Sequence, residues 1–334
     1  MLRFVLRRLA LLVPVLVGLS ILLFIWLRAL PGDPARSMLG QRATPEGIAR
    51  INESYGFDQP LVTQYFSYVK ALLTGDFGSS IQDGRPVVET FFEKFPATLE
   101  LGFSALLLAV VLGVPLGYLA ARHQGRTLDT FVVSGSLLGV VTPVFFLAIL
   151  LKLVFADWLN WLPSSLRQDP RIEATHITNF YVLDGLMTRE WDAAFDALVH
   201  LILPAVALGT IPLAIIVRIT RASVAEVLNE DYVRTAESKG LSRRIVSRRH
   251  VLRNALLPVV TTIGLQAGLL FSGAVLTETV FAFNGIGEYL FTAISGRDYP
   301  VLQAYILFIA LIYALINLLV DMTYGVIDPR VRVS

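Results

Sequence analysis

Six long stretches of the chain carry no Asp, Glu, Lys or Arg, and the charged residues gather in the segments between them. Each stretch is close to the roughly 20 apolar residues that a helix needs to cross about 30 Å of hydrocarbon. Because backbone groups cannot stay unpaired in lipid, the pattern predicts an all-α membrane protein with six transmembrane helices. The stretches are Leu9–Leu27, Leu101–Ala121, Thr130–Leu151, Ala197–Val217, Asn254–Thr277 and Tyr299–Val320.

The first stretch has an alternative interpretation as the apolar region of a cleaved signal peptide, because Arg3, Arg7 and Arg8 precede it. It is long for such a region. The sequence that follows is Pro31-Gly32-Asp33-Pro34 rather than a cleavage site of small residues. We therefore interpret this stretch as a transmembrane helix.

The basic residues of the connecting segments predict the orientation. With six helices they fall on one side, which the excess of arginine and lysine marks as the cytoplasm, and both termini are then cytoplasmic. The opposite segment Trp158–Asp196 is net acidic. The basic residues are Arg3, Arg7, Arg8, Arg122, Arg126, Arg234, Lys239, Arg243, Arg244, Arg248, Arg249, Arg253, Arg330 and Arg332.

These segments predict four parts. Residues 1–30 hold the first transmembrane helix, and residues 31–95 form a helical cap on the outer membrane surface. Residues 96–325 form a five-helix core that includes the basic loop 222–254, and residues 326–334 are a cytoplasmic tail.

Capping signals predict two helices within the cap. Thr44 is a good N-cap with Pro45 at the first helical position, and Gly56 ends that helix. A second helix starts near Pro60, and its apolar residues share one face at helical spacing. These residues are Leu61, Tyr65, Tyr68, Val69 and Leu72.

Composition narrows the chemistry. The chain is 55% hydrophobic with mean hydropathy +0.65, and its net charge of +2 needs no nucleic acid to explain it. The absence of cysteine excludes disulfides, thiolate metal sites and a cysteine nucleophile. None of the four lysines is followed by Ser or Thr, so the chain has no phosphate-binding loop of the GxxxxGK[ST] type. The four histidines show no metal-binding spacing. We therefore predict no catalytic residue and no metal site.

An ion-coupled transporter needs an ionisable group near the middle of a helix. The charged residues lie instead at the edges of the apolar stretches, and Asp321 near the inner end of the sixth stretch could pair with Arg218. The middles of the helices offer neutral polar residues such as Gln266 and Asn317. The sequence therefore predicts a channel-like bundle that has no evident energy source of its own.

Small residues recur four apart, which allows helices to approach closely. Packing within the chain is the stronger interpretation. The alternative is a subunit interface or a substrate path along Gly264, Gly268 and Ser272. The repeated pairs are Gly113 and Gly117, Gly135 and Gly139, and the run Gly264, Gly268 and Ser272.

The most charged loop, DYVRTAESKGLSRRIVSRRH from Asp231 to His250, carries its own helix signals. Asp231 is a good cap, and Gly240 supplies a left-handed stop after barely two turns. Ser242 can cap a second helix. A helix this short is marginal alone in water, so neighbouring helices or another protein must hold it. Attraction to anionic lipid explains the arginines, but it does not explain Asp231, Glu237 or the break at Gly240.

This loop resembles the "EAA" loop of bacterial ABC importer permeases, and Gly240 matches the family's glycine. The family's Glu-Ala-Ala falls on Arg234-Thr235-Ala236, where only Ala236 is kept. Its downstream Ile-x-Leu-Pro falls on His250–Arg253 and matches only at Leu252.

Motifs along nearly the whole chain resemble the dipeptide/oligopeptide importer family, and in particular its first permease subunit, which itself uses Arg-Thr-Ala in this loop. The motifs are LPGDPA (Leu30–Ala35), GDFGSSI (Gly75–Ile81), FPATLELG (Phe95–Gly102), DYVRTAESKGL (Asp231–Leu241), RNALLPVVT (Arg253–Thr261), TETVFAFNGIGEYL (Thr277–Leu290), RDYPV (Arg297–Val301) and LLVDMTYGVIDPRVR (Leu318–Arg332).

The resemblance implies a type I ABC importer permease fold in a bacterial inner membrane. It also implies a second homologous permease, two ATPases that bind ATP and Mg, and an external solute-binding protein, with no cofactor on this chain. The loop would dock on an ATPase as a coupling helix, and we expect the outer segments 31–95 and Trp158–Asp196 to dock the binding protein. The coupling residues would be Asp231, Tyr232, Arg234, Ala236, Glu237, Gly240 and Leu241, and the pathway or helix-contact residues would be Gly264, Gln266, Gly268 and Ser272.

Three functions are then compared. A permease subunit of a peptide importer is the leading one, a self-contained secondary transporter or channel is the alternative, and a structural membrane subunit is the third. The absence of both a phosphate-binding loop and a mid-membrane acid favours the first over the second. The sequence leaves the cargo open among dipeptides, longer peptides, nickel chelates, glutathione and haem.

Overall fold

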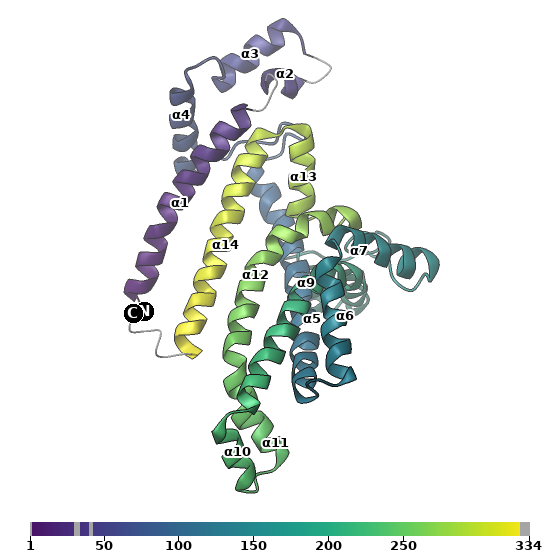
Figure 1. Cartoon of the computed structure of the whole chain (residues 1–334). Coiled ribbons are helices and arrows are strands. Elements are labelled where there is room, and N and C mark those ends of the chain that lie inside the picture. The colour runs from purple at the N-terminus through teal and green to yellow at the C-terminus, as the bar shows by residue number, and fades with distance from the viewer. Residues whose placement is uncertain (1, 30–33, 40–42, 328–334) are drawn as a thin grey trace. The chain divides into compact units, whose positions relative to one another are not determined.

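The computed structural model describes residues 2–29, 34–39 and 43–327 of the chain, and its regular elements there are helices (Figure 1). One isolated antiparallel bridge joins Ser79 to Pro86. The α-helices are α1 (Leu2–Ala29), α2 (Pro34–Leu39), α3 (Pro45–Tyr55), α4 (Leu61–Thr74), α5 (Val87–Arg122), α6 (Thr127–Val141), α7 (Val144–Leu151), α8 (Tyr181–Thr188), α9 (Trp191–Leu228), α10 (Asp231–Ser238), α11 (Arg243–Ile245), α12 (Arg253–Phe281), α13 (Ile286–Gly296) and α14 (Tyr299–Ile327), and π-helical segments cover Lys152–Trp158 and Val246–Leu252.

The contacts within the chain define two compact units. The first comprises Met1–Phe95 and Gly285–Leu315, and the second comprises Pro96–Asn284 and Ile316–Ser334. Helices α5 and α14 each continue from one unit into the other.

Four helices are long and apolar enough to cross a membrane in the described part of the chain, and there are six if each of two bent helix pairs counts as one span. The four are Arg7–Ala29, Val87–Arg122, Trp191–Leu228 and Tyr299–Leu318. The helical class expected from the sequence is confirmed. The orientation of the termini stays a prediction.

The third apolar stretch is not the straight helix that its composition predicts. Helix α6 and the following helical run Val144–Trp158 meet at an angle of 104°. Pro143 has no N–H to donate, and its ring disfavours a helical conformation at the preceding residue. Thr142 accordingly is extended, with ψ 123°. Proline chemistry therefore breaks this stretch where the count of apolar residues predicts continuity.

In the first unit the predicted helix boundaries of the cap are confirmed. The Thr44 Oγ1 accepts a hydrogen bond from the Gly47 N–H, and Gly56 ends α3 with φ 65°. Helix α4 begins directly after Pro60. Its Tyr65 and Tyr68 lie against Phe24 of α1, whereas Leu61, which the periodicity placed on the same face, is exposed.

A buried carboxylate fastens the loop after α4 to the turn between α13 and α14. Asp298 is 1% exposed, and its Oδ2 accepts hydrogen bonds from the Ser80 hydroxyl at 2.6 Å and the Ile81 N–H at 2.9 Å. The Gln82 N–H adds a third donor at 3.3 Å. The motifs GDFGSSI and RDYPV are therefore two halves of one hydrogen-bonded contact.

In the second unit α9 is the most buried membrane helix, with 61% of its apolar window inside the protein. Glycines let other helices approach its backbone. A Cβ added at Gly117 of α5 would lie 2.6 Å from the Val217 carbonyl oxygen, and one at Gly209 of α9 would lie 2.9 Å from the Ala105 carbonyl oxygen. Packing within the chain, the stronger interpretation of these small residues, is what Gly117 provides.

We expect Asp298→Asn to destabilise the first unit. The amide keeps one acceptor oxygen and loses the charge, so its NH2 group must face either the loop donors that now bond to Oδ2 or the Val301 N–H that now bonds to Oδ1. Either arrangement leaves a buried donor unpaired at a cost of about 1–3 kcal/mol. Thermal unfolding of the detergent-solubilised protein, together with limited proteolysis of residues 75–86, measures the effect. Asp58→Asn changes an exposed carboxylate and is the matched control. Equal melting temperatures for the two variants would contradict this role of Asp298.

We expect Gly117→Ala to destabilise the second unit by about 1–3 kcal/mol, because the added methyl forces the α5 and α9 backbones apart. The control is Gly102→Ala on the same helix, where an added Cβ meets nothing within 4 Å. Since alanine favours helix over glycine by up to about 1 kcal/mol, the control should be neutral or stabilising. Thermal melts in detergent compare the two. Melts that move in the same direction would show that this contact is loose.

Candidate functional site: the loop between α9 and α12

The loop from residue 229 to residue 252 folds into the short helix α10, the helix α11 and a π-helical turn. The N-cap and the first residue of α10 both lie one residue earlier in the chain than the sequence predicts. Glu230 occupies the N-cap position with extended dihedrals, and Asp231 is the first helical residue. The prediction that Asp231 caps the helix is therefore wrong. Its carboxylate lies in the first turn, where the helix dipole favours a negative charge.

The end of α10 is the predicted one. Gly240 has φ 75°, the Gly240 N–H donates to the Glu237 carbonyl, and the Leu241 N–H donates to the Ala236 carbonyl. This is the Schellman arrangement, in which a left-handed residue closes the helix and satisfies its last carbonyls. Ser242 takes the next N-cap position, before α11, as expected.

One face of α10 is held by its own chain. Val233 and Ala236 are 1% and 4% exposed. They belong to a buried cluster with Ala121 of α5, Val224 of α9, Val246 and Val251 of the π-helical turn, and Ala255 of α12. Neighbouring helices thus supply the support that a helix of eight residues lacks in water.

Polar contacts hold the same region. Asn254 of α12 donates a hydrogen bond from its Nδ2 to the Tyr232 hydroxyl at 3.0 Å. Arg221 of α9, one helical turn before the cluster, makes a two-pronged ion pair with Asp129 of α6 at 2.5 and 2.7 Å. Asp129 also accepts from the Gly125 N–H. The first contact ties α10 to α12, and the ion pair ties α9 to α6.

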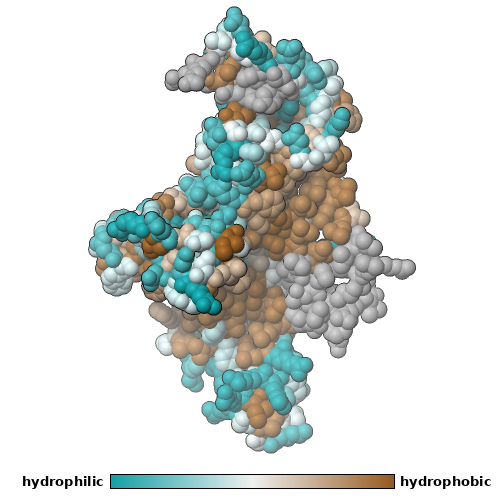
Figure 2. Space-filling model, turned by 180° about the vertical axis from the view of Figure 1, so that it is seen from behind, coloured by the Kyte–Doolittle hydropathy of each residue, from teal (hydrophilic) through white to brown (hydrophobic). Residues whose placement is uncertain are grey.

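The opposite face of α10 and the residues after it are exposed. Tyr232, Leu241 and Ile245 are each about two-fifths exposed, at 41%, 39% and 42%. Glu237 and Arg234 are also exposed. Figure 2 shows hydrophobic surface enclosed by hydrophilic surface at the end of the molecule that carries α10 and α11 (Figures 1 and 2). The surface therefore combines apolar side chains with a rim of charge.

The second predicted group lies elsewhere on α12. Gly264 and Gly268 are buried, and Gln266 is 7% exposed. The side chain of Ser272 lies outside the described residues, as does that of Asp321, the expected partner of Arg218. Gly264 follows the start of α12 by eleven residues, or roughly 16 Å of helix. The structure therefore does not join these residues to the loop surface.

The outer segment between the π-helical turn at Trp158 and α9 is anchored by a pair that sequence reasoning missed. The Arg167 Nη2 lies 2.7 Å from the Glu100 carboxylate of α5, and the two side chains are 7% and 9% exposed. Arg167 also donates to the Asn179 carbonyl, and Glu100 accepts from the Val182 N–H. The sequence signal was present in Glu100, a charge within the motif FPATLELG, but its partner is 67 residues away.

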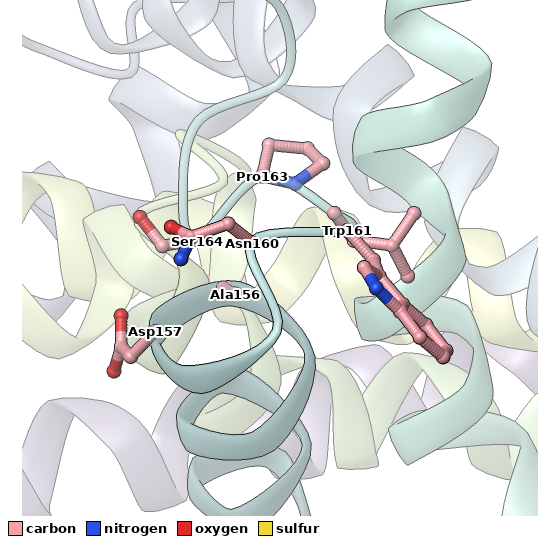
Figure 3. Close-up of a pocket in the computed structure, with 7 residues that line it drawn as sticks. Ala156, Asp157, Asn160, Trp161, Pro163 and Ser164 are labelled. Carbon is pink, nitrogen blue, oxygen red and sulfur yellow. The ribbon is translucent and has the colours of Figure 1, made fainter.

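At the surface of this segment, Arg171 donates to Asp169 and holds the pKa of that carboxyl at about 2. A shallow hollow of about 590 Å³ lies near the start of this segment and is lined by residues 156–157 and 160–164 (Figure 3). Figure 3 shows Asn160 and Ser164 close together and Asp157 pointing away from them. Such an arrangement brings no nucleophile and base together. Among the described residues, no group of three His, Asp or Glu side chains is placed to hold a metal ion.

The apolar helices and the packed loop between α9 and α12 define an all-helical membrane protein with several spans. The solved structures agree at the level of the fold: a chain of the MetNI methionine ABC transporter in an inward-facing conformation aligns with TM-score 0.54 at 15% identity, covering 72% of this chain and 96% of that one. The chain belongs to the family of binding-protein-dependent transport system inner membrane components, whose model matches residues 113–333. The family's N-terminal model matches residues 1–102.

Curated relatives extend over the full length. A dipeptide transport system permease protein, DppB, of Alkalihalophilus pseudofirmus is 44% identical over 99% of this chain and 100% of its own. The di/tripeptide permease DppB of Pseudomonas aeruginosa is 46% identical over 99% of both chains. The glutathione permease GsiC of Salmonella paratyphi A is 38% identical over 99% of both chains. The protein is therefore an ABC importer permease of the bacterial inner membrane.

We expect Arg167→Met to destabilise the outer segment strongly, because it leaves the buried Glu100 carboxylate without its cation at a cost of about 3–5 kcal/mol. Adding Glu100→Gln should recover much of the loss. Thermal unfolding and protease sensitivity of residues 158–190 measure both. Arg171→Met removes an arginine whose side chain is 89% exposed and should cost little. If it proved as damaging as Arg167→Met, the buried pair would not be the anchor.

Proposed function

We propose that this chain is the first of two permease subunits in an ATP-driven importer of dipeptides or short oligopeptides, and that α10 is its coupling helix. The observation that carries the coupling role is the two-sided helix α10. One face is packed into the chain by Val233 and Ala236, whereas Tyr232 on the helix and Leu241 directly after the helix end are 41% and 39% exposed. A short helix that is packed against its own chain on one side and exposed on another can pass the motion of a bound partner to the helices it packs against.

In this proposal α10 docks into a groove of a cytoplasmic ATPase. Tyr232 and Leu241 are the apolar anchors, and Asp231, Arg234 and Glu237 provide the polar rim. Ala236 contributes to coupling indirectly, because its buried side chain packs α10 against its own chain. Two such ATPases bind ATP and Mg, and this chain binds no cofactor. Both termini and the loop are cytoplasmic in this arrangement.

The remaining partners follow from the same assembly. A second homologous permease completes the pathway, to which Gly264, Gln266, Gly268 and Ser272 contribute as path or helix contact. An external solute-binding protein docks on the cap and on the anchored outer segment. Peptide cargo is supported by the names of the full-length relatives, and the glutathione relative shows that similar chains serve different cargo. Family membership disfavours a self-contained channel or secondary transporter.

We expect Gly240→Val to uncouple the transporter. A β-branched residue at a positive φ costs about 1–3 kcal/mol, which is relieved by tilting the end of α10. Docking should then weaken about tenfold or more. Uptake by the assembled transporter in liposomes, measured beside its ATP hydrolysis, should fall while the protein still reaches the membrane. Gly240→Asn is the control, because asparagine tolerates the left-handed region.

Cross-linking tests the docking directly, because the chain has no cysteine of its own. Leu241→Cys should cross-link to a cysteine placed in the ATPase groove, and Arg248→Cys, which we assign to the lipid side, should not. Glu237→Lys should weaken the same contact by reversing a charge. Failure of Leu241→Cys to cross-link in every nucleotide state, with normal uptake by Gly240→Val, would refute the coupling role.

A further inference from the structure

Helix α4 has three distinct faces rather than two. Gln64, Tyr65 and Tyr68 face α1. A stripe of apolar side chains, Val62, Phe66, Val69 and Leu73, follows helical spacing on a second face, and Val62, Phe66 and Leu73 are 67%, 67% and 83% exposed. A third face carries the exposed polar residues Thr63, Ser67, Lys70 and Thr74. Contact with α1 explains the first face and leaves the apolar stripe unexplained.

The contacts with α1 place one turn of α4 beside the last part of the α1 apolar stretch. The Arg28 guanidinium donates to the Gln64 side chain at 2.8 Å, the Phe24 ring packs edge-on against Tyr65 at 5.3 Å, and the Ser20 and Tyr65 hydroxyls are 3.0 Å apart. From Arg28 to Ser20 the contact extends eight residues, or about 12 Å, along α1. Ser20 lies about 10 Å inward from Leu27, the end of the first apolar stretch.

One turn of α4, from Gln64 to Tyr68, therefore contacts α1 at the last part of the α1 apolar stretch. In that part α1 itself exposes Ile21 and Ile25, at 40% and 60%. The exposed stripe of α4 is apolar like this surface of α1. The adjoining polar face and Lys70, whose long side chain can reach the headgroups, are the features of a helix that lies in the membrane interface. Helices of that kind bury their apolar face about 5–10 Å into the headgroup and acyl boundary.

We propose that α4 is an interfacial membrane helix, whose stripe of Val62, Phe66, Val69 and Leu73 is immersed in lipid acyl chains while Thr63, Ser67, Lys70 and Thr74 face water and headgroups. The cap is then part of the membrane-embedded body of the first unit rather than a domain resting above the bilayer. The occupant of the stripe is lipid, because α4 contacts α1 where α1 exposes apolar side chains and carries its polar face directly beside the apolar one.

The test uses the assembled transporter in lipid nanodiscs, with cysteines of the partner chains replaced. Single variants Phe66→Cys and Leu73→Cys carry a nitroxide on the apolar stripe. Ser67→Cys and Lys70→Cys carry it on the polar face at neighbouring positions along the same helix. Collision of the nitroxide with oxygen, which concentrates in lipid, is compared with collision with a water-soluble nickel chelate. The ratio of oxygen to chelate collision should be several-fold higher at Phe66 and Leu73 than at Ser67 and Lys70.

Two results would overturn the proposal. Equal chelate access at all four positions would place the stripe in water. Protection of Phe66 and Leu73 from both oxygen and chelate would place it against another protein, such as the second permease. Uptake by each labelled transporter is recorded in parallel, so that a variant that fails to assemble is recognised and replaced by Val62→Cys on the same stripe.

Discussion

Close approach of helix backbones to α9 is the constraint on which the second unit depends. In a bilayer the lipid tails are as apolar as leucine, so helices associate through van der Waals contact and hydrogen bonds rather than through burial of oil from water. Gly117 brings α5 within contact of the Val217 carbonyl, and Gly209 does the same for Ala105. Any side chain at these positions would widen the gap and remove contacts along the whole helix pair.

Buried charged side chains join segments that lie far apart in the sequence. Glu100 with Arg167 and Asp129 with Arg221 each join segments far apart in the sequence, and Asp298 does the same within the first unit. A charge that is paired in a medium of low dielectric is held strongly, because separating it leaves an ion without solvent. The loops beyond the apolar helices are therefore anchored at defined points, and the base of the α9–α12 loop is one of them.

Packing against its own chain means that the candidate coupling surface on α10 is already folded. Helix α10 is folded before any partner arrives, since Val233 and Ala236 already lie in the cluster with Val224 and Val251. Its exposed side needs no ordering on association, so little of the binding free energy is spent on folding. In the proposed coupling role, force on Tyr232 reaches α12 through Asn254, and force on α10 reaches α9 through the cluster that Val233 and Ala236 share with Val224.

The sequence by itself determined the features that arise within a few residues. Apolar length predicted membrane helices, Thr44 and Gly56 predicted the ends of α3, and Gly240 predicted a left-handed stop, because caps and turns are local hydrogen-bonding and steric effects. Even locally it failed where two signals compete. Glu230 rather than Asp231 became the N-cap, and Pro143 broke a stretch that apolar length predicted to be continuous. Only the tertiary structure decided the partners of Asp298 and Glu100, which lie up to 218 and 82 residues away, and the contact of α4 with α1. Such pairs depend on which helices pack together, and that choice is made by the shapes of whole helix surfaces, which no short pattern records.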